Sequence, residues 1–136
     1  MQKLNLEDRV KLTRAIVGLL DSWGVSAAAQ MELLALPEGT RPGAMRQFRQ
    51  STPFPEDARV MERIEHLIGI ADALRTSYPH NAHMGSIWMN KANHRFENRT
   101  PLAAMLEDGM GGIIAVRTHL DCAYDWHISG SDRSSK

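Results

Sequence analysis

The sequence predicts an all-α protein. Apolar residues recur at helical spacing along nearly the whole chain, and prolines and glycines divide this pattern into separate segments. The β-branched residues are scattered, and no apolar-polar alternation extends beyond a few positions, so no segment is typical of a β-strand. A chain of 136 residues forms one domain of ordinary size, or two small ones that share a core.

Three helices are expected in the first half of the chain. The first carries one apolar stripe that ends just before Gly24, a residue that stops helices. Ser26 can cap the second helix, and Pro42 can open the third, because the N–H that proline lacks has no helical partner in a first turn. The expected ranges are 6–22, 27–36 and 42–49.

A longer helix is expected over residues 55–77. Pro55 suits a first helical turn, and Glu56 and Asp57 place negative charge at the positive end of the helix dipole. The apolar residues that follow form one stripe, and Pro79 stops the helix.

The last third is expected to hold three more helices, joined by a polar loop over residues 90–99. Thr100 and Pro101 form an N-cap and first-turn pair, and Gly109 suits the position after a helix end. Two further glycines, at 111 and 112, separate this helix from the last. The expected ranges are 83–89, 101–108 and 113–125, followed by a polar tail that frays from residue 129.

Charge and cysteine content exclude several classes of protein. Sixteen basic and 16 acidic residues balance exactly in number, which excludes a surface coated with basic residues for nucleic acid. The single cysteine, Cys122, excludes an intrachain disulfide framework and favours the reducing cytoplasm. No apolar run approaches the ~20 residues of a membrane span.

Two short helices and a turn in the first half are typical of a helix-turn-helix, whose second helix reads the DNA major groove. The candidate reading segment has a local excess of basic residues and no acid. Arginine can bind guanine or phosphate, and glutamine can bind adenine. The same pattern also fits an ordinary solvated helix face, and the residues leave both interpretations open. The candidate DNA-binding residues are Arg41, Arg46, Gln47, Arg49 and Gln50.

Metal binding and catalysis have little support in the sequence. His80 and His83 are spaced for one helix turn, but no cysteine pair or HExxH frame accompanies them, so no metal site is expected. His119 and Cys122 could form a nucleophilic pair, but no motif supplies an oxyanion site or an orienting third group. We therefore expect no catalytic residues and no enzyme.

The last two-thirds of the chain resemble a known family. The pattern consists of Trp88, Asn93, Phe96, Arg99-Thr100-Pro101-Leu102, Met105, Gly109, Val116-Arg117 and Leu120, preceded by Arg63-Ile64, Leu67-Ile68-Gly69-Ile70, Ala73-Leu74 and Tyr78-Pro79. It resembles the toxin-binding domain of the Xre/MbcA/ParS-type antitoxins. The segments Trp23-Gly24-Val25-Ser26 and Leu33-Leu34 resemble the helix-turn-helix of the same family.

The resemblance implies a helix-turn-helix-like region at 1–77, joined by its long helix to a toxin-binding domain at 78–128 and a flexible tail at 129–136. The partner would be a RES-domain toxin, an NAD-consuming enzyme whose NAD cleft the antitoxin covers. Gly69 would allow close helix approach. The toxin-binding residues would be Trp88, Asn93, Phe96, Arg99, Arg117, His119 and Tyr124.

By the same resemblance, the protein needs no cofactor, and its helix-turn-helix binds the promoter of its own operon as a homodimer or as a hetero-oligomer with the toxin. The sequence departs from the family where Ala35 replaces a glycine and a proline- and glycine-rich stretch lengthens the turn before Phe48. The alternative hypothesis is a DNA-binding transcriptional regulator without a toxin partner.

Overall fold

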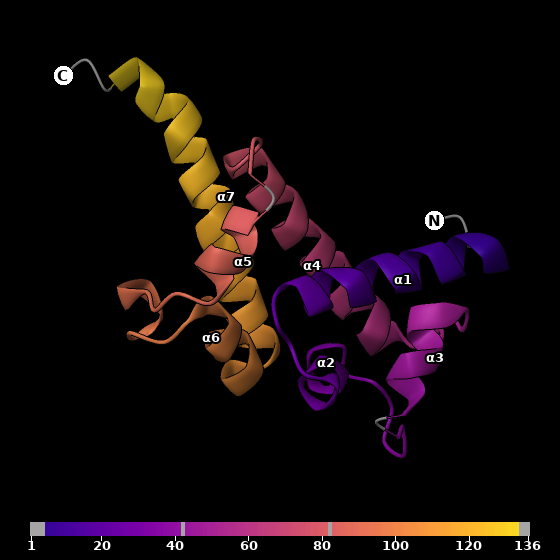
Figure 1. Cartoon of the computed structure of the whole chain (residues 1–136). Helices are drawn as coiled ribbons and strands as arrows, with labels where there is room; N and C mark the ends of the chain where they lie inside the picture. The colour runs from indigo at the N-terminus through magenta and orange to yellow at the C-terminus, as the bar shows by residue number, and fades with distance from the viewer. Residues whose placement is uncertain (1–4, 42, 82, 134–136) are drawn as a thin grey trace. The chain divides into compact units, whose positions relative to one another are not determined.

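The computed structural model describes residues 5–41, 43–81 and 83–133 (Figure 1). These residues form helices and loops without a strand, which confirms the predicted all-α class. The α-helices are α1 (Leu6–Ser22), α2 (Ala27–Leu33), α3 (Ala44–Gln50), α4 (Ala58–Ser77), α5 (His83–Met89), α6 (Pro101–Asp108) and α7 (Met110–Arg133), with the 3-10 helix η1 (His94–Phe96) between α5 and α6. Among the described helices, none is both long and apolar enough to cross a bilayer.

The chain divides into two compact units, Met1–Glu65 and His66–Lys136. From the sequence alone we expect the boundary after residue 77, where the long helix ends. The structure divides the chain within α4 instead, because the second half of this helix contributes Gly69 to a close contact with Arg117 of α7.

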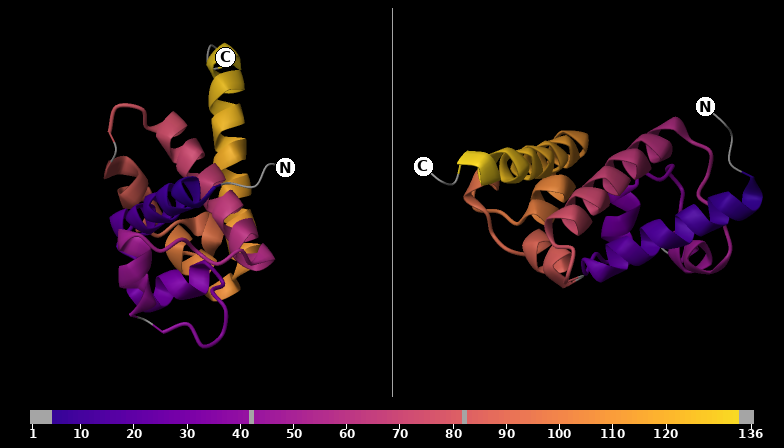
Figure 2. Two further views of the ribbon diagram at one scale, coloured as in Figure 1. Left: turned by 90° about the vertical axis from the view of Figure 1, so that its right-hand side faces the viewer. Right: turned by 90° about the horizontal axis from the view of Figure 1, so that it is seen from above.

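In the first unit, α1 packs against α3 (Figure 2). Its core consists of apolar side chains with little or no exposure, among them Leu20, Trp23, Leu33, Leu34, Met45 and Phe48. The buried hydroxyl of Thr13 donates to the Arg9 carbonyl at 2.8 Å and accepts from the Phe54 amide at 2.9 Å. This hydroxyl therefore ties α1 to the segment that leads into α4.

The segment between α2 and α3 differs from the expected one. Ser26 caps α2 as predicted, since its hydroxyl accepts from the Ala29 amide at 3.3 Å. However, α2 ends at Leu33, because Ala35 adopts a left-handed conformation with φ of 52°. An L side chain there costs about 1–2 kcal/mol, a strain that a glycine would avoid. The third helix begins at Ala44, and the predicted first-turn residue Pro42 lies outside the described residues.

In the second unit, α6 and α7 pack side by side (Figure 2). The Thr100 hydroxyl caps α6 by accepting from the Ala103 amide at 2.9 Å, and Gly109 ends the helix with φ of 64°, both as predicted. The start of the last helix is not as predicted: α7 begins at Met110 and includes both glycines that we expected to precede it.

The last helix also extends beyond its expected end near residue 125, and α7 reaches Arg133. The first residues of the expected flexible tail are therefore helical. A physical reason is that no proline occurs between residues 110 and 133, so no backbone donor is missing along the helix. Residues 134–136 lie outside the described part of the chain.

Helices α6 and α7 approach so closely that only glycine fits at position 112. A Cβ atom at Gly112 would lie 2.1 Å from the Ala104 carbonyl oxygen and 3.0 Å from the Asp108 Cβ. At Gly111, one residue earlier in the same helix, an added Cβ would have no neighbour within 4 Å. The contact between α6 and α7 therefore requires a glycine at position 112 but not at position 111.

We expect Gly112→Ala to lower the free energy of unfolding by about 1–3 kcal/mol or more, because the clash is with backbone that cannot rotate away. Gly111→Ala is the matched control and should leave stability unchanged or slightly raised, since alanine favours helix. Thermal and urea unfolding followed by circular dichroism measures both. Equal effects of the two substitutions would contradict the proposed close contact.

Candidate functional site

Three of the predicted toxin-binding residues meet in an aromatic cluster in the second unit. The Trp88 ring of α5 stacks on His119 of α7, with ring centroids 6.0 Å apart and planes inclined by 8°. Phe96 of η1 meets both rings edge-on, at 6.4 Å from Trp88 and 5.6 Å from His119. Residues from three elements far apart in sequence therefore form one site, the Trp88–Phe96–His119 cluster.

The members of this cluster differ in exposure. Phe96 is buried, whereas Trp88 and His119 are half-buried and present part of their rings to solvent. Ile87, the residue before Trp88 on α5, is 53% exposed. Phe96 is thus the buried member of the cluster, and Trp88 and His119 form its exposed part.

The surroundings of His119 favour the neutral form of its ring. Partial burial disfavours the charged ring and lowers the pKa of His119, and the nearby positive charges of Arg95 and His94 lower it further. A neutral imidazole stacks on an indole without the cost of desolvating a cation. The cluster therefore presents an uncharged aromatic surface with basic side chains beside it.

The loop between α5 and α6 is closed by its own backbone. The Asn93 amide donates to the Arg99 carbonyl at 3.0 Å, and the Asn93 side chain accepts from the Arg95 amide at 2.9 Å. Glu97 and Asn98 turn the chain in left-handed conformations, with φ of 61° and 64°. Asn93 therefore shapes the loop, while the side chains of His94, Arg95 and Glu97 are exposed.

Arg99 joins this loop to the end of α6. Its Nε donates to the Phe96 carbonyl at 3.0 Å, and its Nη1 and Nη2 donate to the two carboxylate oxygens of Asp108 at 3.1 and 2.9 Å. Glu107 accepts a further bond at 3.3 Å. The guanidinium lowers the pKa of the Asp108 carboxyl, and the acids raise the pKa of Arg99. The Arg99 side chain is only 24% exposed. Its bonds to Phe96 and Asp108 hold the loop in position.

Arg117 lies on a different face of α7 from His119, because residues two positions apart on a helix point in different directions. Its guanidinium covers Gly69, where an added Cβ would lie 2.5 Å from the Arg117 Nε. Its Nη1 lies 3.1 Å from the His66 Nδ1. The space at Gly69 is thus filled by the Arg117 side chain and not by the backbone of another helix, and this position separates Arg117 from the aromatic cluster.

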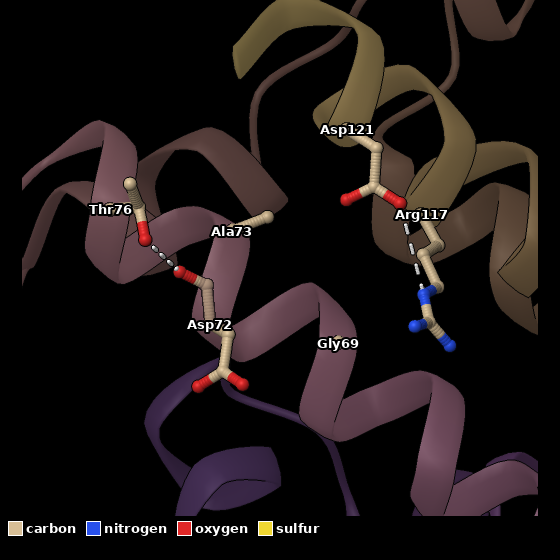
Figure 3. Close-up of a pocket in the computed structure, with 6 residues that line it drawn as sticks. All are labelled: Gly69, Asp72, Ala73, Thr76, Arg117 and Asp121. Carbon is tan, nitrogen blue, oxygen red and sulfur yellow. Dashed lines mark hydrogen bonds and ion pairs between the residues drawn. The ribbon is translucent and has the colours of Figure 1, made fainter. Parts of the chain in front are cut away.

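Arg117 lines a shallow groove of about 280 Å³ between α4 and α7 (Figure 3). The α4 side consists of Gly69, Asp72, Ala73 and Thr76, and Asp121 joins Arg117 on the α7 side, 3.9 Å from its Nε. The seventh predicted contact, Tyr124, lies in the part of α7 whose side chains are outside the described residues.

The predicted DNA-binding residues are exposed on the first unit. Arg46, Gln47 and Gln50 lie on α3, and Arg41 lies in the segment before it. Arg49 is different, because it forms a two-point ion pair with Asp21 of α1. Residues 34–43 separate α2 from α3, a longer connection than the three or four residues of a usual helix-turn-helix.

Within the described residues, no group of three His, Cys, Asp or Glu side chains could hold a metal ion. Cys122 is exposed on α7, while the neighbouring His119 stacks on Trp88. Sequence reasoning missed the roles of Gly112, His66 and Asp108, because each depends on a partner in another element. Of these three residues, only Gly112 has a recognisable signal in the sequence, because it is a glycine next to a predicted helix.

Comparison with protein families places this site in a known domain. Residues 73–123 match the family model for the antitoxin Xre/MbcA/ParS C-terminal toxin-binding domain. This range includes α5, η1, α6 and the α7 residues of the cluster, and over these residues it confirms the resemblance to the toxin-binding domain. No curated protein and no solved structure gives a significant match to the chain.

We expect a histidine NMR titration of the full chain to place the pKa of His119 below its ordinary value of 6.5. Arg95→Gln should raise it by removing a nearby positive charge, whereas Arg59→Gln, whose charge does not act on His119, should not. Because folding favours the neutral ring, the His119 contribution to stability is lost as the pH falls below about 6.5 towards the folded pKa. A pKa at or above 6.5 would contradict the buried stack.

Proposed function

We propose that the protein is the antitoxin of a type II toxin–antitoxin pair and that it neutralises a RES-type, NAD-consuming toxin by covering its NAD cleft. The match of residues 73–123 to the toxin-binding domain carries this proposal. In this role the protein is a binding partner without catalytic residues or a cofactor of its own, and it acts in the cytoplasm.

The proposed contact surface surrounds the aromatic cluster. Trp88 and His119 contribute half-buried rings, and Ile87 contributes exposed apolar area beside them. Large aromatic and apolar side chains contribute most of the binding energy in protein interfaces, while residues around them exclude water. Phe96, Asn93 and Arg99 act through the loop whose shape they hold, and we expect their substitution to weaken binding indirectly.

We include Arg117 and Tyr124 on α7 as further toxin contacts. Arg117 is half-buried and lines the groove next to Asp121, so it would meet a different part of the toxin from Trp88. A toxin that contacts both faces has to extend around α7.

The test begins with co-expression of the chain and the reading frame next to its gene. We expect a stable complex and loss of toxin activity. Ile87→Asp should weaken binding at least tenfold, measured by calorimetry, because it places a charge in the apolar part of the interface. Met61→Asp is the matched control, since Met61 is also exposed, at 42%, but lies in the first unit, outside both proposed contact faces.

Three outcomes would overturn this proposal. The neighbouring frame could encode no RES-type protein, the two proteins could form no complex, or Ile87→Asp could bind as well as the wild type. Because Ile87 is exposed, the variant should fold normally, and circular dichroism checks this before binding is measured.

We further propose that the first unit binds the promoter of its own operon, as a homodimer or in complex with the toxin. Its support is the exposed group of Arg41, Arg46, Gln47 and Gln50, in a segment without an acidic residue from 41 to 55. Arginine and glutamine side chains can bind both phosphates and base edges. If no toxin gene is present, the same surface supports the alternative, a transcriptional regulator without a toxin.

We expect Arg46→Ala to weaken binding to a labelled promoter duplex and to reduce the salt dependence by roughly one phosphate contact, or about 0.9 in log–log slope. Fluorescence anisotropy between about 50 and 200 mM salt measures both quantities. Arg59→Ala, an exposed arginine on α4 outside the basic segment, serves as the control. Binding that is absent at low salt, or unaffected by salt, would contradict the proposal.

A further inference from the structure

The guanidinium of Arg49 is held by a carboxylate of its own unit. Its Nε donates to Asp21 Oδ2 and its Nη2 donates to Asp21 Oδ1, both at 2.9 Å. Two parallel bonds to one carboxylate are the strongest pairing geometry of arginine, and the same geometry is used for phosphate. The hydrogen bonds from Arg49 lower the pKa of the Asp21 carboxyl, and those to Asp21 raise the pKa of Arg49. The Asp21 carboxylate and a phosphate would therefore compete for the same guanidinium of Arg49.

The carboxylate is itself held in place from below. The Gln30 side chain is fully buried, and its Nε2 donates to Asp21 Oδ1 at 2.7 Å and to the Val25 carbonyl at 2.9 Å. Among the described residues, its amide oxygen has no hydrogen-bond partner. A buried amide from α2 thus fixes an exposed carboxylate on α1, which in turn fixes a side chain on α3.

The position of Arg49 on α3 agrees with this pairing. Met45 and Phe48 form the buried stripe of the helix, and Arg46 and Gln50, one turn apart, point away from it. At about 100° per residue, Arg49 lies between these two faces, on the flank beside the buried stripe. Backbone geometry and the ion pair therefore both place Arg49 at the edge of the exposed face, turned towards Asp21 of α1.

We propose that Asp21 withholds Arg49 from nucleic acid, so that the DNA-facing surface consists of Arg41, Arg46, Gln47 and Gln50 without Arg49. This inference rests on the proposed DNA binding. Both partners of the pair are partly exposed, at 44% and 40%, so the competition is finite. Exposed pairs of this kind correspond to roughly a two- to fivefold effect on an equilibrium.

The test is a double-mutant cycle on the full chain, with the labelled promoter duplex at about 50 mM salt as the probe. Asp21→Asn removes the charge but keeps an oxygen that accepts from Gln30. We expect it to raise DNA affinity roughly two- to fivefold and to steepen the salt dependence by about 0.9 in slope, one extra phosphate contact. Arg49→Gln alone should leave affinity unchanged, and the double variant should bind like the wild type.

Each other outcome overturns the inference. If Asp21→Asn does not raise DNA affinity although the wild type binds the duplex, Asp21 does not keep Arg49 from DNA. If the double variant keeps the gain, the effect is simple removal of a negative charge. If Arg49→Gln alone weakens binding, Arg49 already contacts DNA in the wild type. This measurement tests the inference even if Asp21→Asn fails to fold. If no protein binds the duplex, the proposed DNA binding fails together with the inference.

Discussion

The close approach of α6 and α7 at Gly112 is the constraint on which the second unit depends. The Ala104 carbonyl lies where a side chain at residue 112 would otherwise be. This contact sets the spacing between the end of α6, which holds Asp108, and the face of α7 that holds His119. Arg99 binds Asp108, and Phe96 and Trp88 meet His119, so the loop between α5 and α6 takes its place from the same contact.

Several charged side chains form ion pairs within their own unit. Arg9 pairs with Glu56, Arg49 with Asp21, and Arg99 with Asp108. In contrast, Arg46 and Arg95 form no ion pair among the described residues, although both are exposed. Arg46 and Arg95 therefore remain available for the two partners that we propose. Net charge describes neither surface.

The predicted toxin-binding residues fall into two physical classes. Trp88 and His119 are partly exposed and can touch a partner, whereas Asn93, Phe96 and Arg99 use their polar atoms or rings within the unit. A sequence pattern cannot separate these classes, because a residue that shapes a binding loop and a residue that contacts the partner are constrained equally. The distinction matters for mutational experiments, where loss of loop structure and loss of contact both weaken binding.

The sequence by itself determined the helical class, the caps at Ser26 and Thr100 and the stop at Gly109, because each depends on residues within about one helical turn. Only the tertiary structure decided the division within α4, the aromatic cluster and the pairing of Arg49 with Asp21, 28 positions away in the chain. The structure also shows that Gly111 and Gly112 belong to α7 and not to a connection before it. Packing against α6 requires a residue without a side chain at position 112. Local hydrogen bonds are encoded by spacing, whereas distant contacts depend on how the helices pack.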